Sequence, residues 1–400
     1  MTDPRVLSQQ LLDRLAGSGE LTPVWSEAFA AVPRHQFIPD MIWTTHDAEL
    51  VPLRRAENPQ EWMQRVYGPA AVTVQVDDGH PLVPGRRGRY ITSSASQPNV
   101  VVRMLDALDA QPGMRVLEIG TGTGYNAALL AHRLGGENVT SVEIDRDLAE
   151  HARRALATSG YPLAVITADG TRGYPPHAPY DRIMSTAAVQ HVPYPWIAQT
   201  RPGGKILTPW GTHYHNGALV SFIVNRDGTA QGRIVGNVAF MFLRDQRIYA
   251  SVDDEECDET TARKSQTTVT PYSVVGDYDA SLAIGMKVPG CSVIVVPDPT
   301  VELTGTLWFV DPDTDSWANM HYQPHTCVYP IHQSGPRNLW DEVETAYHWW
   351  RQVGCPGPER WQIMITPEGQ QVTLTETSAL ATTEWSIDPM SAVGPDHRDR

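Results

Sequence analysis

The ten residues Val116-Leu-Glu-Ile-Gly-Thr-Gly-Thr-Gly-Tyr125 decide the fold of this chain. The first four suit a buried strand, glycines follow at alternate positions (Gly120, Gly122 and Gly124), and an apolar, Ala- and Leu-rich helical pattern runs over 126–134. A strand that ends in a glycine turn and opens a helix presents backbone N–H groups and the positive end of a helix to a ligand. The spacing is G-x-G-x-G, whereas dinucleotide sites have G-x-G-x-x-G.

Two acids follow the glycine turn, each at the end of a predicted strand. Glu143 ends a strand over 139–144 and lies 143 − 120 = 23 residues past Gly120, where a carboxylate reaches the two hydroxyls of a ribose. Asp169 follows a strand over 163–168 and is placed to meet an adenine edge. A glycine turn, an acid placed for the ribose and an acid placed for the adenine occur in the order and at the spacing that a nucleoside cofactor needs. Together they predict a site for S-adenosyl-L-methionine, with S-adenosyl-L-homocysteine as the product form. The alternative is an unrelated α/β unit whose glycines allow tight packing. The predicted cofactor-binding residues are Glu118, Gly120, Thr121, Gly122, Gly124, Glu143, Ile144, Asp169 and Gly170.

Strands and helices alternate through the middle of the chain, which is typical of a doubly wound, mostly parallel sheet. We therefore predict an α/β fold of the Rossmann-like, S-adenosylmethionine-dependent methyltransferase class. Ligands of such sheets bind at the carboxyl ends of the strands, where the glycine turn and both acids fall. The expected strands are 115–119, 139–143, 163–168, 180–185, 204–208 and 218–224, and the expected helices 97–108, 124–134 and 146–158.

Changes of pattern divide the 400 residues into four predicted parts. Residues 1–90 form an N-terminal cap with helices over 4–17 and 25–32, followed by an irregular Pro-, Gly- and Arg-rich region. Residues 91–230 form the cofactor-binding core. Residues 231–390 form a C-terminal α+β extension with one clear helix over 339–353. Residues 391–400 form a tail, and we expect disorder after Asp388.

The composition excludes several classes of protein. A net charge of −15 and a pI near 5.3 argue against a nucleic-acid groove, which needs clustered Lys and Arg. No apolar run is long enough to span a membrane, and no secretion signal is visible, so we expect a cytoplasmic protein. Four scattered cysteines without a C-x-x-C pair suit reduced thiols. For the pair His213 and His215 we expect a surface loop, and we predict no metal site.

The N-terminal half closely resembles protein-L-isoaspartate O-methyltransferases over about 200 residues. This resemblance implies methyl transfer from S-adenosylmethionine to an aspartyl or isoaspartyl carboxylate in a peptide. The stretches that carry it are A-F-A-A-V-P-R-H-Q-F-I-P (Ala28–Pro39), S-Q-P (Ser96–Pro98), P-G-M-R-V-L-E-I-G-T-G-T-G-Y-N-A-A-L-L-A (Pro112–Ala131), S-V-E-I-D (Ser141–Asp145), A-D-G (Ala168–Gly170), A-P-Y-D-R-I (Ala178–Ile183) and R-P-G-G-K-I-L-T-P-W-G (Arg201–Gly211).

The chain departs from that family at its C-terminal end, since the family normally ends near residue 225 to 245. The stretch G-P-R-N-L-W-D-E-V-E-T-A-Y-H-W-W-R (Gly335–Arg351) resembles the C-terminal domain of methyltransferases that act on ribosomally made peptides, such as lanthipeptides, lasso peptides and graspetides. This resemblance implies a dedicated, macrocyclised precursor peptide whose methyl ester leads to an aspartimide or an isoaspartate. Trp340 and Trp350 are candidate peptide contacts, although their helical spacing favours core packing as the default.

The chemistry requires orientation rather than a general base, because a carboxylate is already charged at neutral pH. Ser96 is the main candidate for orienting the substrate carboxylate, just before a helix whose N–H groups could help to bind it. The alternative is that Ser96 only caps that helix. Further candidates at this edge are Thr92, Ser93, Ser94, Thr186, Gln199 and Arg201.

Three functions therefore remain open. The leading hypothesis is esterification of one aspartate in a dedicated modified peptide. The second is general repair of isoaspartate in aged proteins, against which the long extension argues. The third is a peptide-binding protein with an inactive methyltransferase scaffold, against which the intact motif residues argue. The sequence does not choose between aspartimide and isoaspartate as product, and it does not fix the oligomeric state.

Overall fold

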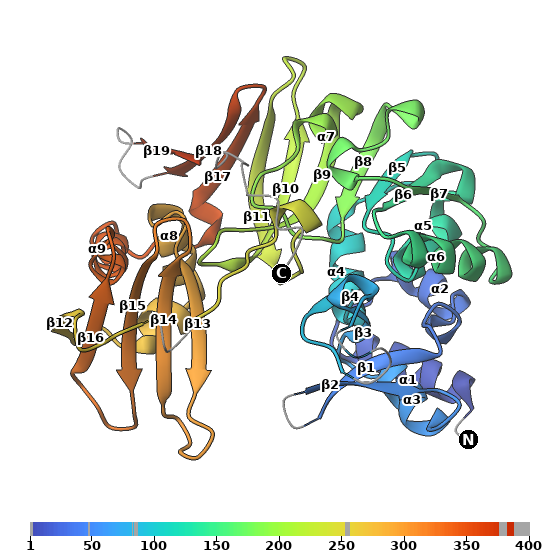
Figure 1. Ribbon diagram of the computed structural model, residues 1–400. Helices are drawn as coiled ribbons and strands as arrows, with labels where there is room; N and C mark the ends of the chain where they lie inside the picture. Colours follow the sequence, from blue (N-terminus) through green and yellow to red (C-terminus); the bar gives the residue numbers. More distant parts are fainter. Residues whose placement is uncertain are drawn as a thin grey trace. The chain divides into compact units, whose positions relative to one another are not determined.

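The computed structural model describes residues 3–46, 49–81, 83, 87–252, 257–375 and 382–387, the last range by its backbone alone. These residues form two compact units (Figure 1). The first contains the described residues of 1–187, 193–208 and 221–230, and the second those of 188–192, 209–220 and 231–400. The chain therefore passes between the units several times. The predicted tail and the residues after Asp388 lie outside the described ranges.

The N-terminal part of the first unit is more regular than its sequence suggests. Helix α1 begins after Asp3, whose side chain accepts from the N–H of Arg5, and it spans the predicted residues 4–17. A four-stranded antiparallel sheet of order β2-β1-β3-β4 follows, in a region that we expected to be mostly irregular. The elements are α1 (Pro4–Gly17), α2 (Pro23–Ala31), β1 (Met41–His46), β2 (Glu49–Arg54), α3 (Pro59–Val66), β3 (Val72–Val76) and β4 (Ile91–Ala95).

The core of the first unit is the parallel sheet that the sequence predicts. Its strands run in the order β7-β6-β5-β8-β9, and each neighbouring pair is parallel. All side chains of β5, β6 and β8 are buried, as expected for strands covered on both faces. Figure 1 shows α5 and α6 beside these strands. The elements are α4 (Pro98–Leu108), β5 (Val116–Ile119), α5 (Tyr125–Leu134), β6 (Val139–Glu143), α6 (Arg146–Thr158), β7 (Ala164–Thr167), β8 (Tyr180–Ser185), α7 (Tyr194–Gln199) and β9 (Thr200–Gly211).

The second unit combines helices with antiparallel strands. A five-stranded sheet has the order β12-β16-β15-β14-β13, and β17, β18 and β19 form an antiparallel ladder. One face of the five-stranded sheet buries Phe309 against Trp340 of α9, with ring centroids 5.5 Å apart. The elements are β10 (Asn216–Val224), β11 (Ala230–Asn237), β12 (Arg263–Thr267), α8 (Tyr278–Lys287), β13 (Ser292–Pro297), β14 (Gly305–Asp311), β15 (Ser316–Tyr322), β16 (Tyr329–Ser334), α9 (Leu339–Gln352), β17 (Trp361–Thr366), β18 (Gly369–Thr375) and β19 (Thr382–Ile387).

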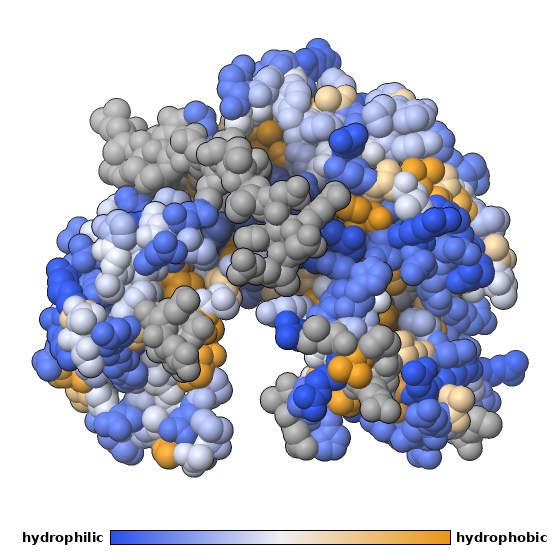
Figure 2. Space-filling view, in the orientation of Figure 1, coloured by the Kyte–Doolittle hydropathy of each residue, from blue (hydrophilic) through white to orange (hydrophobic). Residues whose placement is uncertain are grey.

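The surface is largely polar on the face that Figure 2 shows, where apolar atoms form small groups among hydrophilic ones. This agrees with the net charge of −15. Within the described ranges, no helix has both the length and the apolar character needed to cross a bilayer.

Candidate active site

The glycine turn after β5 has a backbone that side chains rarely allow. Gly120, Gly122 and Gly124 have φ angles of 88°, 54° and 85°, which only glycine adopts readily. A Cβ at Gly120 would lie 2.7 Å from Thr186 Oγ1. That hydroxyl donates to the carbonyls of Gly120 (2.5 Å) and Ile119 (3.1 Å). Thr186 therefore lies at the turn, as expected, and its hydroxyl supports the turn.

Glu118 is fully buried next to the turn and is held by two donors. Its Oε1 accepts from Asn126 Nδ2 at 2.7 Å, and its Oε2 accepts from Ser141 Oγ at 2.5 Å. Thr121 joins the same group through a 2.6 Å contact between its Oγ1 and Ser141 Oγ. Burial raises the pKa of Glu118 to about 7, against the opposing effect of the two hydrogen bonds. Because Glu118 and Thr121 are both buried, we assign them to the support of the turn.

Glu143 meets the glycine turn directly. Its Oε2 accepts from the N–H of Gly122 at 2.8 Å, and its Oε1 accepts from the N–H of Asp145 at 3.0 Å. The next residue, Ile144, is 41% exposed and offers an apolar surface beside the acid. The structure thus brings Glu143 to the glycine turn, although Glu143 and Gly120 are 23 residues apart in the sequence.

Asp169 and Gly170 follow β7, the next strand of the sheet. The Asp169 carboxylate accepts from the N–H and the hydroxyl of Thr171, at 2.9 and 2.7 Å, so it begins a short 3-10 turn. A Cβ at Gly170 would lie 2.6 Å from Ile119 Cγ2. Close packing against Ile119 therefore leaves no room for a side chain at position 170. The N–H of Ala168 donates to the carbonyl of Glu143 at 3.0 Å, so both predicted acids lie at the same edge.

Ser96 lies between β4 and α4, and its backbone is fixed by a buried arginine. Arg34, which is 1% exposed, donates from Nη2 to the carbonyls of Ser96 (2.7 Å) and Ala95 (3.2 Å). The N-cap of α4 is Gln97, so Ser96 is not the helix cap that we considered as its alternative role. In the part of the chain that the structure describes, the Ser96 hydroxyl makes no hydrogen bond. Arg34 lies in the V-P-R-H-Q-F-I-P stretch, but no local pattern there indicates its contact with Ser96, 62 residues away.

The other hydroxyls on β4 differ in their surroundings. Thr92 Oγ1 donates to Gln75 Oε1 and accepts from the N–H of Asp78, both at 3.0 Å, so it holds a neighbouring turn. Ser93 is buried, and its Oγ lies 3.9 Å from a Cβ built at Gly122. Of these two hydroxyls, that of Ser93 is therefore the one placed beside the glycine turn.

Several other candidates lie elsewhere. Trp340 and Trp350 are 1% and 6% exposed, so their rings belong to the core of the second unit and offer a peptide little surface. Arg201 pairs with Asp181 at 2.5 Å, where β8 begins, so the expectation that it lies at the cofactor edge is wrong. His215 is 7% exposed and its Nδ1 lies 2.8 Å from Ser281 Oγ, so it is not in a surface loop.

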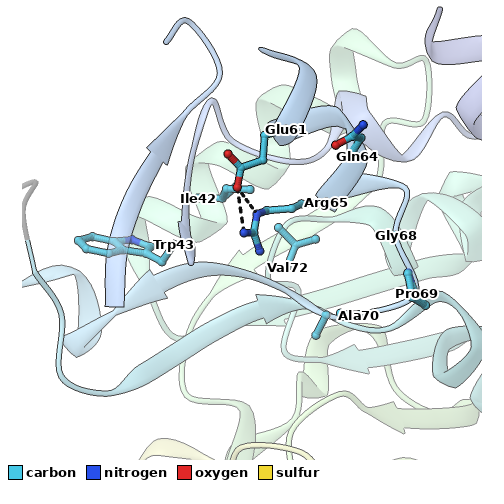
Figure 3. A pocket seen from close by; sticks show the side chains of 10 residues that line it. Ile42, Trp43, Glu61, Gln64, Arg65, Gly68, Pro69, Ala70 and Val72 are labelled. Atoms are coloured by element: carbon cyan, nitrogen blue, oxygen red, sulfur yellow. Dashed lines mark hydrogen bonds and ion pairs between the residues drawn. The ribbon is translucent and has the colours of Figure 1, made fainter. Parts of the chain in front are cut away.

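A separate hollow of about 330 Å³ lies beside the N-terminal sheet. Figure 3 shows its walls, with Trp43 on one side and the ion pair of Glu61 and Arg65 on another; that pair is 2.9 Å apart. None of the predicted cofactor-binding residues lines this hollow.

The parallel sheet, the glycine turn and the two acids define an α/β methyltransferase. Comparison with known proteins gives the family. A family model for protein-L-isoaspartate(D-aspartate) O-methyltransferase matches residues 54–248. The protein-L-isoaspartate O-methyltransferase of Pyrococcus horikoshii is 39% identical over 169 residues, which are 42% of this chain and 73% of that protein. The enzyme of the same name from Methanopyrus kandleri is 35% identical over 239 residues, which are 59% of this chain and 90% of that protein.

This chain belongs to the protein-L-isoaspartate O-methyltransferase family. It is accordingly a carboxyl O-methyltransferase, and S-adenosyl-L-methionine is its methyl donor. A solved structure of a protein-L-isoaspartate O-methyltransferase aligns with 92% of this chain and 99% of its own, with a TM-score of 0.51 and 20% identity. At this identity the likeness concerns the fold alone, but it reaches well beyond the N-terminal half.

Proposed function

We propose that this enzyme esterifies the side-chain carboxylate of one aspartate in a dedicated, macrocyclised peptide of ribosomal origin. Its membership of the isoaspartate methyltransferase family supports the carboxylate as the methyl acceptor. The choice of a dedicated peptide rests on the second unit, which adds a large folded surface to the catalytic unit.

The residues at the glycine turn fit the cofactor. The backbone of Gly120 to Gly124, the Glu143 carboxylate and the Asp169 carboxylate would hold it, and Ile144 would cover an apolar part of it. When bound, S-adenosylmethionine supplies an electrophilic methyl group. The protein's own task is to hold the acceptor oxygen in line and to exclude water, and such orientation accounts for a large share of the rate gain in two-reactant steps.

Ser96 is the residue that we assign to the acceptor. Its hydroxyl is half-buried and has no partner in the described residues, while its carbonyl is fixed by Arg34. A hydroxyl held in this way can donate to one carboxylate oxygen and leave the other oxygen for methylation. The acceptor is ionised at neutral pH, so no base is required.

The ester prepares the next step in the peptide itself. An ester carbonyl is a better electrophile than a carboxylate, so the backbone nitrogen of the following residue can attack it. A C–N bond forms as the C–O bond to the methoxy group breaks, and the proton of the nitrogen passes through solvent to the departing methoxide, which leaves as methanol. The product is a succinimide (aspartimide), which water can open to an isoaspartate.

The observation that carries the dedicated-peptide proposal is an apolar hollow in the second unit. It has a volume of about 620 Å³ and is lined by Tyr272, Leu303 and Tyr329, among others. Tyr272 and Leu303 are 69% and 74% exposed, so their side chains form an accessible apolar wall of the hollow. We assign this hollow to the peptide, at positions remote from the methylated aspartate, because remote contacts can support the chemical step.

General repair of isoaspartate is the second candidate, and one observation favours it. The solved isoaspartate methyltransferase aligns with 92% of this chain, so its fold includes a counterpart of most of the C-terminal part as well. A long chain is therefore not by itself a mark of a dedicated substrate.

Two variants of the hollow separate these candidates. Tyr272→Ala and Leu303→Glu change exposed side chains, so the fold should remain intact. We expect kcat/KM for the proposed macrocyclised precursor peptide to fall at least about tenfold, the equivalent of 1.4 kcal/mol. Activity on a short isoaspartyl peptide should not change. Tyr249→Ala is the matched control, because Tyr249 is 72% exposed in the same unit and does not line the hollow. Equal activity of all variants on the precursor would contradict the assignment.

A further inference from the structure

One group of potential metal ligands lies in the second unit, outside the cofactor site. Glu259, His321 and His332 each offer a ligand atom, and these atoms all lie within 4.8 Å of one another. This is the single group of three or more such residues found in the described part of the chain. His321 belongs to β15 and His332 to β16, which are neighbours in the five-stranded sheet (Figure 1).

The register of the sheet places both imidazoles on one face. His332 is the partner of Asn319 on β15, and His321 follows Asn319 by two residues, so all three side chains point to the same side. Glu259 comes from the segment before β12 and reaches this face. Its Oε1 lies 2.9 Å from His321 Nε2, and its Oε2 lies 3.5 Å from His332 Nδ1.

Small movements of these side chains would bring their ligand atoms to the spacing found around a metal ion. Ligand atoms at about 2.0–2.2 Å from a tetrahedral zinc lie roughly 3.3–3.5 Å from one another. The set of two imidazoles and one carboxylate is a known zinc donor set with an open fourth position. The side chains of His321 and Glu259 are 41% and 37% exposed, so an ion has access from solvent.

Neighbouring side chains orient the ligands. Thr306 Oγ1 lies 3.0 Å from His321 Nδ1, so Thr306 can accept the Nδ1 proton and leave the Nε2 lone pair facing the site. Asn319 is fully buried, and its Nδ2 donates to Glu259 Oε1 at 2.6 Å. Its Oδ1 lies 3.1 Å from His332 Nδ1 and can only accept, so Nδ1 gives up its proton when a metal ion binds there. Partners of this kind fix the tautomer and the orientation of ligands in metal sites.

We propose that Glu259, His321 and His332 bind one zinc ion, with water as the fourth ligand. The ion ties the segment that leads into β12 to strands β15 and β16 of the sheet. The site shares no residue with the cofactor site, so its test does not depend on methyl transfer. This proposal reverses the expectation from the sequence, which found no metal pattern because the three ligands are 62 and 11 residues apart (321 − 259 and 332 − 321).

The test is direct metal binding by the full chain without an affinity tag. The protein is dialysed against a chelator and then titrated with Zn²⁺ by calorimetry, and with Co²⁺ by visible absorption. We expect one ion per chain and an intense Co²⁺ spectrum typical of four-coordinate sites. His321→Ala and His332→Ala should each weaken Zn²⁺ binding at least about tenfold. His348→Ala is the matched control, because His348 is an exposed histidine of the same unit, and it should bind like the wild type.

Folding of each variant is checked by near-ultraviolet circular dichroism. If His332→Ala does not fold, His321→Ala, whose side chain is 41% exposed, decides the question. The proposal is overturned if the wild type binds no Zn²⁺, or if the double variant of His321 and His332 binds it with unchanged stoichiometry and affinity. In that case the three side chains form only a hydrogen-bonded cluster.

Discussion

Glu143 connects the end of β6 to the glycine turn by accepting from the N–H groups of Gly122 and Asp145. Two separate demands therefore meet in one carboxylate. It holds the turn in place, and we propose that it also binds the ribose hydroxyls of the cofactor. This double role distinguishes it from Glu118, whose oxygens are used by Asn126 and Ser141 in the buried interior.

Replacing Glu143 should weaken cofactor binding. Glu143→Ala removes a charged hydrogen-bond acceptor, a loss of roughly 1.5–3 kcal/mol, so we expect the Kd for S-adenosylmethionine to rise about ten- to a hundred-fold. Glu143→Gln, which keeps one oxygen, should lose less. Calorimetry measures both, with Glu150→Ala on α6 as the control, since the carboxylate of Glu150 pairs with Arg154 and does not touch the glycine turn in the described residues. Unchanged affinity in Glu143→Ala would remove this residue from the cofactor site.

Replacing Ser96 should affect turnover and not the cofactor. Because its hydroxyl has no partner in the described residues, Ser96→Ala removes no hydrogen bond of the folded chain. We expect kcat on the peptide to fall while the Kd for S-adenosylmethionine stays the same. Thr92→Ala should show the opposite behaviour, with lower thermal stability and nearly normal kcat, because Thr92 holds Gln75 and Asp78. If Ser96→Ala stays within about twofold of the wild-type kcat, which is less than 0.5 kcal/mol, the hydroxyl has no role in orientation.

At the scale of elements, the strand–turn–helix unit of β5 and α5 could be predicted because every local signal agreed. Buried strand residues, three glycines and a continuous helical pattern follow one another without a break. The same holds for α1, where Asp3 and Pro4 mark the start. The register of the two acids could be predicted as well, since parallel strands bring their carboxyl ends to one edge.

Other elements could not be predicted because their patterns are atypical. Helix α8 is buried around most of its circumference, so no amphipathic stripe marks it as a helix. Strand β15 carries Asn319 and His321 on one face, and these polar residues obscure its strand pattern. Likewise, the support of Ser96 by Arg34 joins residues that are 62 positions apart, and no local pattern gives such a contact.

His215, the residue before β10, is buried against Ser281 of α8. Its burial predicts that the stability of the fold depends on pH. Burial lowers the pKa of His215 to about 4, while an unfolded histidine has a pKa near 6.5. The folded state thus disfavours the proton, and the contribution of His215 to stability is complete above pH 6.5 and is lost as the pH falls toward 4. The full effect is on the order of 3 kcal/mol.

His215→Gln can keep the hydrogen bond to Ser281 but does not titrate. We expect its melting temperature to fall less than that of the wild type between pH 7 and pH 5. His348→Gln, a change of an exposed histidine in α9, should behave like the wild type. The measurement is the melting temperature at several pH values. If it changes with pH in the same way for wild type and His215→Gln, protonation of His215 does not destabilise the fold.

At the scale of the whole molecule, no single truncation point in the chain separates the two units. Residues 188–192 and 209–220 belong to the second unit, although they lie between segments of the first. Strands β9 and β10 each contribute to both units along their length. A truncation near residue 230 would therefore leave parts of the second unit without their neighbours, and point variants in the hollow of Tyr272 and Leu303 are the better test of the extension.

The central claim is that this enzyme forms a methyl ester on an aspartate of a dedicated peptide. The most direct measurement offers the full chain two substrates in one reaction with S-adenosylmethionine: the macrocyclised precursor peptide with its L-aspartate, and a short isoaspartyl peptide. Mass spectrometry follows a base-labile gain of one methylene, or the loss of water that marks the succinimide. We expect the precursor to be methylated first, and at one aspartate. Faster methylation of the isoaspartyl peptide, with the precursor left unchanged, would contradict it and identify a repair enzyme.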